Sequence, residues 1–333
     1  MLAYFEKRFY YVVCISTELL FTYLYRRAMK ICIIGAGAMG SLFGALLTEA
    51  GHEVGLVGAR PIYVDAIKRN DGVVVEKDGQ RRVVACPVSL DAEDFAPCDL
   101  CIVFVKSTAT AAVAATAARC VSENGLLLSL QNGLGNGEAL AANFDNKRIM
   151  AGHTSQAAFL EQPGVIRHTG SGPTALGSWS GDNKAAAHML ADMFTQAGIA
   201  TQEVDDVHSA IWDKLFVNIG INAIGALANI TNGQVTGFEP SRRLARQALD
   251  EAMNVARHLG IAMREGIWEH ILHIGSVTAQ NHCSMWQDFR MCRVTEIDYM
   301  HGAVSRLGRE NNIPTPVNSV LADLVRAAQL NYL

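Results

Sequence analysis

Short apolar runs alternate with segments of helical spacing through the first part of the chain. Such runs, bounded by turn residues, are typical of strands buried on both faces of a parallel sheet. The expected strands are Ile31 to Ile34, Glu53 to Val57, Leu100 to Val105 and Leu126 to Leu130, with an alanine-rich helix at Ala109 to Cys120. A hairpin at the sheet edge is expected around Asp78 and Gly79, and further strands between Ile149 and Ser178 complete the sheet.

From Asp206 onward the pattern changes to long helices with no strands between them. The expected helices cover residues 209–228, 241–260 and 264–274, with further helix starts at Ser284 and at Thr295, the latter as N-cap, and a turn at Asn232 and Gly233. The predicted fold class is therefore α/β, with an N-terminal Rossmann-type doubly wound parallel sheet followed by an all-α C-terminal domain. We expect residues 29–205 to form the nucleotide-binding domain and residues 206–333 the helical substrate domain.

The stretch from Lys30 to Gly44 has the order strand, glycine turn, helix. Gly35 permits the tight turn, Gly37 lets the backbone approach a pyrophosphate, and Gly40 lets the helix pack closely on the strand. The free N–H groups of the first helical turn then face the anion. A glycine turn in this context predicts a bound dinucleotide rather than a plain tight turn, and the residues expected to hold it are Gly35, Ala36, Gly37, Ala38, Met39 and Gly40.

The end of the second strand indicates which dinucleotide binds. An NAD site places an acidic residue there for the ribose hydroxyls, whereas an NADP site leaves a small or basic residue for the 2′-phosphate. This chain has Gly58, Ala59 and Arg60 at that point. The pattern favours NADP, with Arg60 on the phosphate; the alternative is that Arg60 is a solvated loop charge.

Two further strand ends carry polar side chains, Lys106 and Asn132. Open α/β sheets bind ligands at the carboxyl ends of their parallel strands, so we expect both residues to face the nucleotide. An ordinary turn at the strand end is the alternative for each.

Lys214, Asn218 and Asn222 interrupt an apolar helix at positions i, i+4 and i+8. They lie within about 80° of one another around the helix and form a polar stripe on one face. A lysine is seldom buried without a partner or a task, so the stripe indicates a carbonyl or carboxylate ligand. A hydrogen-bond network between helices is the alternative. Read alone, Glu296 in a first helical turn and Ser284 at a helix start are compatible with helix capping.

Charge and cysteine content narrow the class of protein. The 28 basic and 32 acidic residues give a net charge of −4, which provides no electrostatic basis for binding nucleic acid. Eight scattered cysteines suit reduced thiols in a cytoplasmic protein, and core packing accounts for Cys98 and Cys101 without a metal. We expect residues 1–28 to be an extension outside the fold; an interfacial helix or an oligomer contact is the alternative.

The motifs together resemble the ketopantoate reductase (2-dehydropantoate 2-reductase) family. They are GAGAMG at 35–40, Lys106 after its strand, QNGLGN at 131–136, WDKLFVNIGINAIGAL at 212–227, Asn232-Gly233, SMWQD at 284–288 and TEIDYMHG at 295–302. Their order and spacing cover the chain from Met29 to about Leu330. One departure is that the segment from Gly51 to Arg60 is one residue longer than the family's pattern.

The resemblance implies reduction of 2-dehydropantoate to (R)-pantoate by NADPH, a step towards pantothenate and coenzyme A. Lys214 matches the family's catalytic lysine and Glu296 its acidic partner. Further matches are Asn218, Asn222, Asn232 and Ser284 on the substrate side, and Lys106, Asn132 and Ala158 on the cofactor side. The expected partners are NADP and a small 2-oxo acid, without metal, nucleic acid or membrane, and a homodimer is one option for the assembly.

The chemistry agrees with these positions. Hydride addition to a ketone leaves charge on the oxygen, which the ammonium of Lys214 can stabilise and protonate. We expect Glu296 to hold the substrate hydroxyl, Ser284 the carboxylate end, and Asn218 and Asn222 the hydroxyl end. The alternatives are a reductase of the same fold acting on another 2-oxo acid and a non-catalytic NADP-binding sensor.

Overall fold

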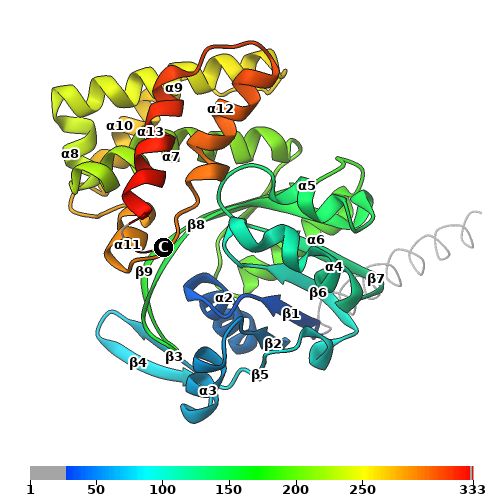
Figure 1. Cartoon of the computed structure of the whole chain (residues 1–333). Helices are drawn as coiled ribbons and strands as arrows, with labels where there is room; N and C mark the ends of the chain where they lie inside the picture. Colours follow the sequence, from blue (N-terminus) through cyan, green and yellow to red (C-terminus); the bar gives the residue numbers. More distant parts are fainter. Residues whose placement is uncertain (1–27, 331, 333) are drawn as a thin grey trace, which may run out of the picture.

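The computed structural model describes residues 28–330 and 332. The expectation for residues 1–28 therefore falls almost wholly outside the described part of the chain. The described residues form a half built on a mixed sheet (the sheet half) followed by a half made of helices (the helical half) (Figure 1).

The sheet half alternates strands and helices. Its elements are β1 (Lys30–Ile34), α2 (Ala38–Glu49), β2 (Glu53–Val57), α3 (Pro61–Arg69), β3 (Val73–Lys77), β4 (Gln80–Val84), β5 (Val88–Ser89), β6 (Cys98–Val103), α4 (Thr110–Cys120), β7 (Val121–Ser129), α5 (Asn136–Ala141), β8 (Ile149–Gln162), β9 (Val165–Ser178), α6 (Lys184–Gln196) and β10 (Thr201–Glu203). The strand order is β4-β3-β9-β8-β7-β6-β1-β2-β5, with β10 beside β9. Only the β3–β4 and β8–β9 pairs of this sheet are antiparallel among the described strands.

Strand β1 lies inside the sheet and shows why helices cover both faces. Ile31 and Ile33 belong to a buried cluster with Phe43 of α2, whereas Cys32 and Ile34 belong to a second cluster that contains residues of α4. Successive side chains of a strand point to opposite faces, so both faces of β1 must be covered. The predicted Rossmann-type α/β fold class is confirmed.

The hairpin prediction is also confirmed. Strands β3 and β4 pair antiparallel, and β4 lies at the end of the sheet. Asp78 and Gly79 between them have φ angles of 50° and 76°. This left-handed conformation is tolerated by glycine and, among other residues, best by asparagine and aspartate.

The helical half consists of α7 (Val207–Ala228), α8 (Asn232–Gly237), α9 (Glu239–His258), α10 (Ile267–Val277), α11 (Ser284–Arg290), α12 (His301–Glu310) and α13 (Pro316–Gln329). Helix α10 begins three residues after the expected start because Gly266, with φ 67°, precedes it. The all-α character is confirmed, while the domain boundary between residues 205 and 206 stays a prediction.

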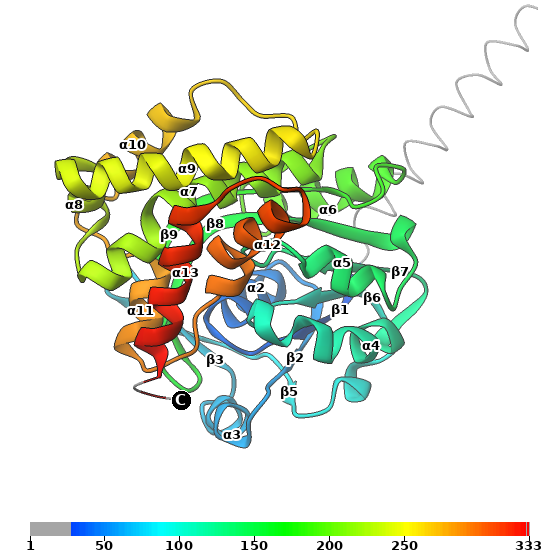
Figure 2. The same cartoon turned by 45° about the horizontal axis from the view of Figure 1, so that its top comes forward.

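Helix α7 joins the two halves. It is long and apolar enough to cross a membrane by length and composition, yet most of it is buried inside the protein. Its residues contact β8 and β9 of the sheet as well as α9, α11 and α13 (Figure 2). Polar residues on α7 are therefore held between the sheet half and the other helices.

Candidate active site

The glycine turn, residues 35–40, links β1 to α2. Gly35 has a φ angle of 123°, and a Cβ on Gly40 would lie 1.9 Å from the carbonyl oxygen of Gly35. A Cβ on Gly37 would meet no atom within 4 Å. Gly37 is the N-cap residue of α2, and no side chain caps this end or places an acidic group in its first turn. The turn therefore leaves room and unopposed N–H groups for an anion, which fits a dinucleotide.

Arg60 lies after β2, where it is the residue that precedes α3. Its guanidinium donates a hydrogen bond to the hydroxyl of Tyr63 (2.7 Å) and lies 4.9 Å from the centre of that ring. The side chain is exposed on the surface of the loop after β2. An exposed guanidinium held by a tyrosine can still accept a phosphate on its remaining donors.

The loops after β6 and β7 are tied together by Ser107. Its hydroxyl donates to the carbonyl oxygen of Asn132 (2.8 Å), and Asn136 donates to the same carbonyl (3.0 Å). The backbone N–H of Leu134 donates to the carbonyl oxygen of Tyr299 in the helical half (2.8 Å). Both strand ends thus lie against the helical half.

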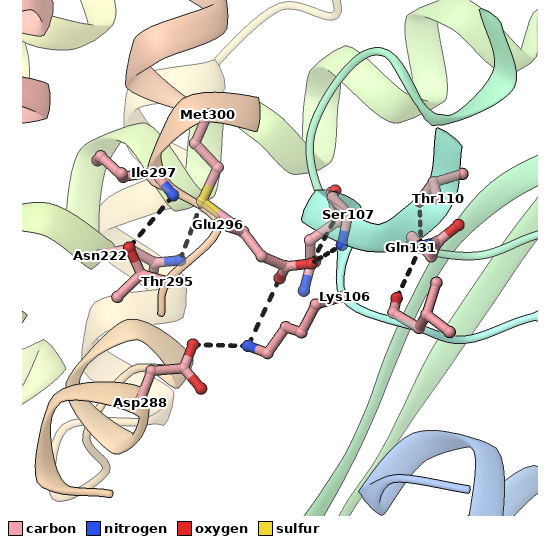
Figure 3. Close-up of polar contacts among 12 residues, drawn as sticks. Lys106, Ser107, Thr110, Gln131, Asn222, Asp288, Thr295, Glu296, Ile297 and Met300 are labelled. Atoms are coloured by element: carbon pink, nitrogen blue, oxygen red, sulfur yellow. Dashed lines mark hydrogen bonds and ion pairs between the residues drawn. The ribbon is translucent and has the colours of Figure 1, made fainter. Parts of the chain in front are cut away.

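A charged cluster, formed by Lys106, Ser107, Asp288 and Glu296, connects the halves (Figure 3). The Nζ of Lys106 lies 2.6 Å from Oδ2 of Asp288 and 3.9 Å from Oε2 of Glu296. Oε1 of Glu296 accepts a hydrogen bond from the backbone N–H of Ser107 (2.9 Å) and lies 2.8 Å from the Ser107 hydroxyl, whose one proton it shares with the carbonyl oxygen of Asn132. Residues of two halves therefore build one polar centre.

Burial and charge oppose each other in this cluster. Burial alone would lower the pKa of Lys106, but the carboxylates of Glu296 and Asp288 outweigh it and raise that pKa. Burial raises the pKa of Asp288, although the Lys106 ammonium acts in the opposite direction. Lys106 is therefore held in its charged form.

The polar stripe of α7 contacts β8 at one end and the segment that follows Glu296 at the other. The Nζ of Lys214 donates to the hydroxyl of Ser155 on β8 (3.3 Å), and burial lowers the pKa of Lys214. Asn218 is 8% exposed, and its Nδ2 has no hydrogen-bond partner among the described residues. The Nδ2 of Asn222 lies 3.7 Å from the sulfur of Met300. A buried amide without a partner indicates room for a ligand rather than a complete hydrogen-bond network.

His153 is a residue that the sequence analysis missed. It lies on β8, two positions before Ser155, and its Nδ1 is buried without a partner in the described part of the chain. Burial, together with the charge of Lys214, lowers the pKa of His153 to about 4. A neutral imidazole therefore lies near the Lys214 ammonium. The sequence signal that could have pointed to His153 was the group of Thr and Ser residues around it on this strand.

The other predicted residues lie further from the cluster. Ser284 is exposed at the first position of α11, the helix that carries Asp288. Asn232 donates from Nδ2 to Thr278 (3.0 Å) and contacts no other predicted site residue by hydrogen bond within the described range. Ala158 packs on β8 against the core of the sheet.

Two local predictions are wrong. Asn232 begins α8 instead of forming a turn, because Thr231 and Gln234 form a capping box around that helix start. Glu296 is not in the first turn of a helix capped by Thr295; it precedes a short 3₁₀ helix, Ile297–Tyr299, and α12 begins only at His301. The Glu296 carboxylate accepts the backbone N–H of Ser107 in the sheet half and not an N–H group of its own segment.

The arrangement suits reduction of an anionic carbonyl compound. The glycine turn can hold a dinucleotide, Lys214 can donate a proton, and Glu296 and Asn218 offer buried acceptor and donor groups between the halves. These roles remain predictions for the individual residues.

Comparison with known proteins agrees with this chemistry. The family model described as Ketopantoate reductase PanE/ApbA matches residues 31–181, and the one described as Ketopantoate reductase PanE/ApbA C terminal matches residues 206–329. The 2-dehydropantoate 2-reductase of Halobacterium salinarum is 36% identical over 301 residues, covering 90% of this chain and 99% of that relative. The corresponding protein of Archaeoglobus fulgidus is 33% identical over 303 residues, covering 91% and 99%.

Solved structures include both a reductase of this type and a dehydrogenase. A PanE/ApbA family ketopantoate reductase from Ralstonia eutropha is 31% identical with a TM-score of 0.83. D-mandelate dehydrogenase, solved with NADH and anilino(oxo)acetate, is 29% identical with a TM-score of 0.86. Each similarity covers 91% of this chain and 99% of the other.

Proposed function

This chain belongs to the ketopantoate reductase family, and we propose that it reduces 2-dehydropantoate to (R)-pantoate with NADPH. It is an oxidoreductase, as are the curated relatives that it resembles over about 90% of its length. We place the reaction in the cytoplasm, on the route to pantothenate and coenzyme A.

The observation that carries the proposal is the environment of Lys214. Among the described residues its Nζ donates one hydrogen bond, to the neutral hydroxyl of Ser155, and burial lowers its pKa. A lysine with a lowered pKa gives up its proton more readily, which is what a general acid must do. When bound, the nicotinamide supplies the hydride; Lys214 stabilises the charge on the substrate oxygen and donates the proton.

The remaining polar groups orient the substrate. Glu296 accepts the hydrogen bond of the substrate hydroxyl on Oε2, and Ser284 binds the carboxylate end. Asn218 and Asn222 bind the hydroxyl end, with the unpartnered Nδ2 of Asn218 as the group that is open to a ligand. Asn232 adds a polar group near the site. Fixing both ends of a small molecule sets the carbonyl in position for reaction.

The choice of cofactor follows from the glycine turn and from the residues at the end of β2. The glycine turn holds the pyrophosphate, and Lys106, Asn132 and Ala158 lie on the cofactor side. Arg60 binds the 2′-phosphate, since no acidic residue follows β2 to hold a ribose 2′-hydroxyl. This selects NADP over NAD.

A second candidate is reduction of another 2-oxo acid with NADH. The observation that favours it is the similarity to D-mandelate dehydrogenase with NADH, whose TM-score of 0.86 is as high as that of the reductase from Ralstonia eutropha. Proteins of one fold can retain a proton donor and differ in the residues around the substrate.

The test is steady-state reduction by the purified chain, followed through the loss of NADPH absorbance. Substrates are 2-dehydropantoate, pyruvate, 2-oxoisovalerate and the oxo acid that corresponds to mandelate, each with NADPH and with NADH. A kcat/KM of about 10⁴ M⁻¹ s⁻¹ or more for 2-dehydropantoate with NADPH, well above the others, supports the proposal. Preference for another oxo acid or for NADH supports the second candidate, and cofactor binding without turnover indicates a sensor.

A further inference from the structure

The ammonium of Lys106 lies between two carboxylates of the helical half but bonds to only one. Its distance of 2.6 Å to Asp288 is that of a charge-assisted hydrogen bond, whereas 3.9 Å to Glu296 is too long for one. Figure 3 shows the ammonium between the two carboxylates, with a dashed line to each. Lys106 therefore forms a hydrogen bond with Asp288 and a longer ion pair with Glu296.

The two oxygens of the Glu296 carboxylate differ in what they bind. Oε1 already accepts the backbone N–H of Ser107, and the Ser107 hydroxyl lies 2.8 Å from it, its one proton shared with the carbonyl oxygen of Asn132. Oε2 accepts none from the described residues, although Glu296 is only 8% exposed. An oxygen of a largely buried carboxylate that lacks a donor is open to a hydroxyl donated by a ligand.

Lys106 can move to take this position. Its side chain is 42% exposed, and a lysine side chain is long and flexible. If Asp288 lost its charge, the nearest remaining carboxylate for the ammonium would be Glu296. Closing the 3.9 Å separation to a direct bond would use Oε2.

We propose that Asp288 is a positioning residue: by binding Lys106 it keeps Oε2 of Glu296 available for the hydroxyl of the substrate. This inference rests on the proposed function, since it takes a hydroxylated 2-oxo acid as the substrate. Asp288 itself touches no reacting atom and acts through Lys106.

The alternative is that the pair only stabilises the fold. Only the Asp288 end of this ion pair is buried, and an ion pair with a buried member is weak evidence for stability, because desolvating the charge offsets the attraction. Burial, together with the charge of Glu296, raises the pKa of Asp288, even though Lys106 and Arg293 oppose that change. The ion pair therefore carries a cost of burial, which fits a role in placing Lys106.

The test compares two substrates that differ only in the hydroxyl. These are 2-dehydropantoate and 3,3-dimethyl-2-oxobutanoate, which has the same carbon skeleton without it. The variants are Asp288→Asn and Asp288→Glu, with Asp205→Asn as a matched control because Asp205 forms an exposed ion pair with Lys184. All rates are measured at saturating NADPH, and melting temperatures verify folding.

We expect Asp288→Asn to lower kcat/KM for 2-dehydropantoate by about 10- to 100-fold, mainly through KM, because a hydrogen bond to a charged group is lost. The hydroxyl-free acid should change by less than about threefold. Asp288→Glu should restore much of the selectivity, and Asp205→Asn should leave both substrates unaffected.

Equal losses for the two substrates, or no loss for either, would overturn the proposal. A second variant set keeps the test sharp if Asp288→Asn folds poorly. In a Lys106→Met background, adding Asp288→Asn should no longer change the selectivity between the two acids, since the residue that Asp288 positions is absent. Wild-type turnover of 2-dehydropantoate tests the proposed function separately from this selectivity.

Discussion

The glycine turn and the charged cluster are both polar regions built at the ends of strands, but they are assembled differently. The turn is one contiguous stretch whose shape follows from its own glycines, as the 1.9 Å approach at Gly40 illustrates. The cluster joins Lys106 to Asp288, 182 residues apart, and Ser107 to Glu296, 189 residues apart. The first region depends on local backbone sterics, and the second depends on how the two halves meet.

The largest effect should come from replacing Lys214 in the polar stripe of α7. Lys214→Ala removes the proposed proton donor, so kcat should fall by about 10²- to 10⁴-fold while NADPH affinity stays near that of the wild type. Lys184→Ala, which removes an exposed ammonium, serves as the control. The measurement is kcat with 2-dehydropantoate, and a near-normal kcat with only KM altered would refute the donor role.

Next in size is a change within the glycine turn. Gly40→Ala places a Cβ against the carbonyl oxygen of Gly35, a backbone atom that cannot move aside, so NADPH affinity should fall at least about 100-fold and the melting temperature by several degrees. Gly37→Ala meets no atom of the protein, and its backbone is extended, so it should fold normally.

Gly37→Ala should nevertheless weaken NADPH binding, because its methyl group enters the space where the pyrophosphate approaches the backbone. Thermal unfolding and NADPH titration of both variants separate the two roles. Equal melting temperatures for Gly40→Ala and the wild type would show that the turn is not held by this contact.

A smaller effect is expected at the rim of the nucleotide site. Arg60→Ala should raise KM for NADPH about tenfold and leave KM for NADH unchanged, since only NADPH carries the 2′-phosphate. Arg69→Ala, an exposed arginine at the end of α3, is the control. A matching rise for both cofactors would assign Arg60 to a role other than phosphate recognition.

The most gradual effect concerns pH. Burial lowers the pKa of Lys214 below its usual 10.5, so the ammonium is lost at a lower pH than that of a free lysine. The reduction needs the protonated form, and its kcat/KM should fall as pH rises through this lowered pKa. The reverse oxidation needs the neutral amine and should rise over the same range.

Measuring kcat/KM of the reduction and of the reverse oxidation between about pH 6 and 10 tests this pH dependence. His153, with a pKa of about 4, stays neutral throughout that range and should add no limb of its own. A reductive rate that increased with pH over the alkaline range would contradict the role of Lys214 as the acid.

The contrast between the local glycine turn and the charged cluster also explains which features could be predicted from the sequence. The strand, turn and helix around Gly35, and the hairpin at Asp78 and Gly79, follow from local conformational preferences and were predicted correctly. The capping box from Thr231 to Gln234 was also local, yet the Asn-Gly pair inside it favoured a turn. Local rules compete, and the structure shows which one prevailed.

The partners of Glu296 could not be predicted in this way. Its neighbours Thr295 and Asp298 resemble a helix start. The N–H group that its carboxylate accepts belongs to Ser107, which lies 189 residues earlier in the sequence. Asp288 was visible in its motif, but its bond to Lys106 exists only because α11 packs against the loop after β6. The sequence alone indicated which residue types form the site, whereas their pairing became apparent only in the tertiary structure.

The polar residues of helix α7 are evenly spaced along its axis. An α-helix rises 1.5 Å per residue, so Lys214, Asn218 and Asn222 stand at steps of about 6 Å along a rigid axis. A molecule that fits between the first two groups is shorter than one that reaches the third. If these three residues bind the substrate as proposed, they would discriminate between oxo acids by length, and a longer oxo acid would be accepted or rejected by residues two turns away from its reacting carbon.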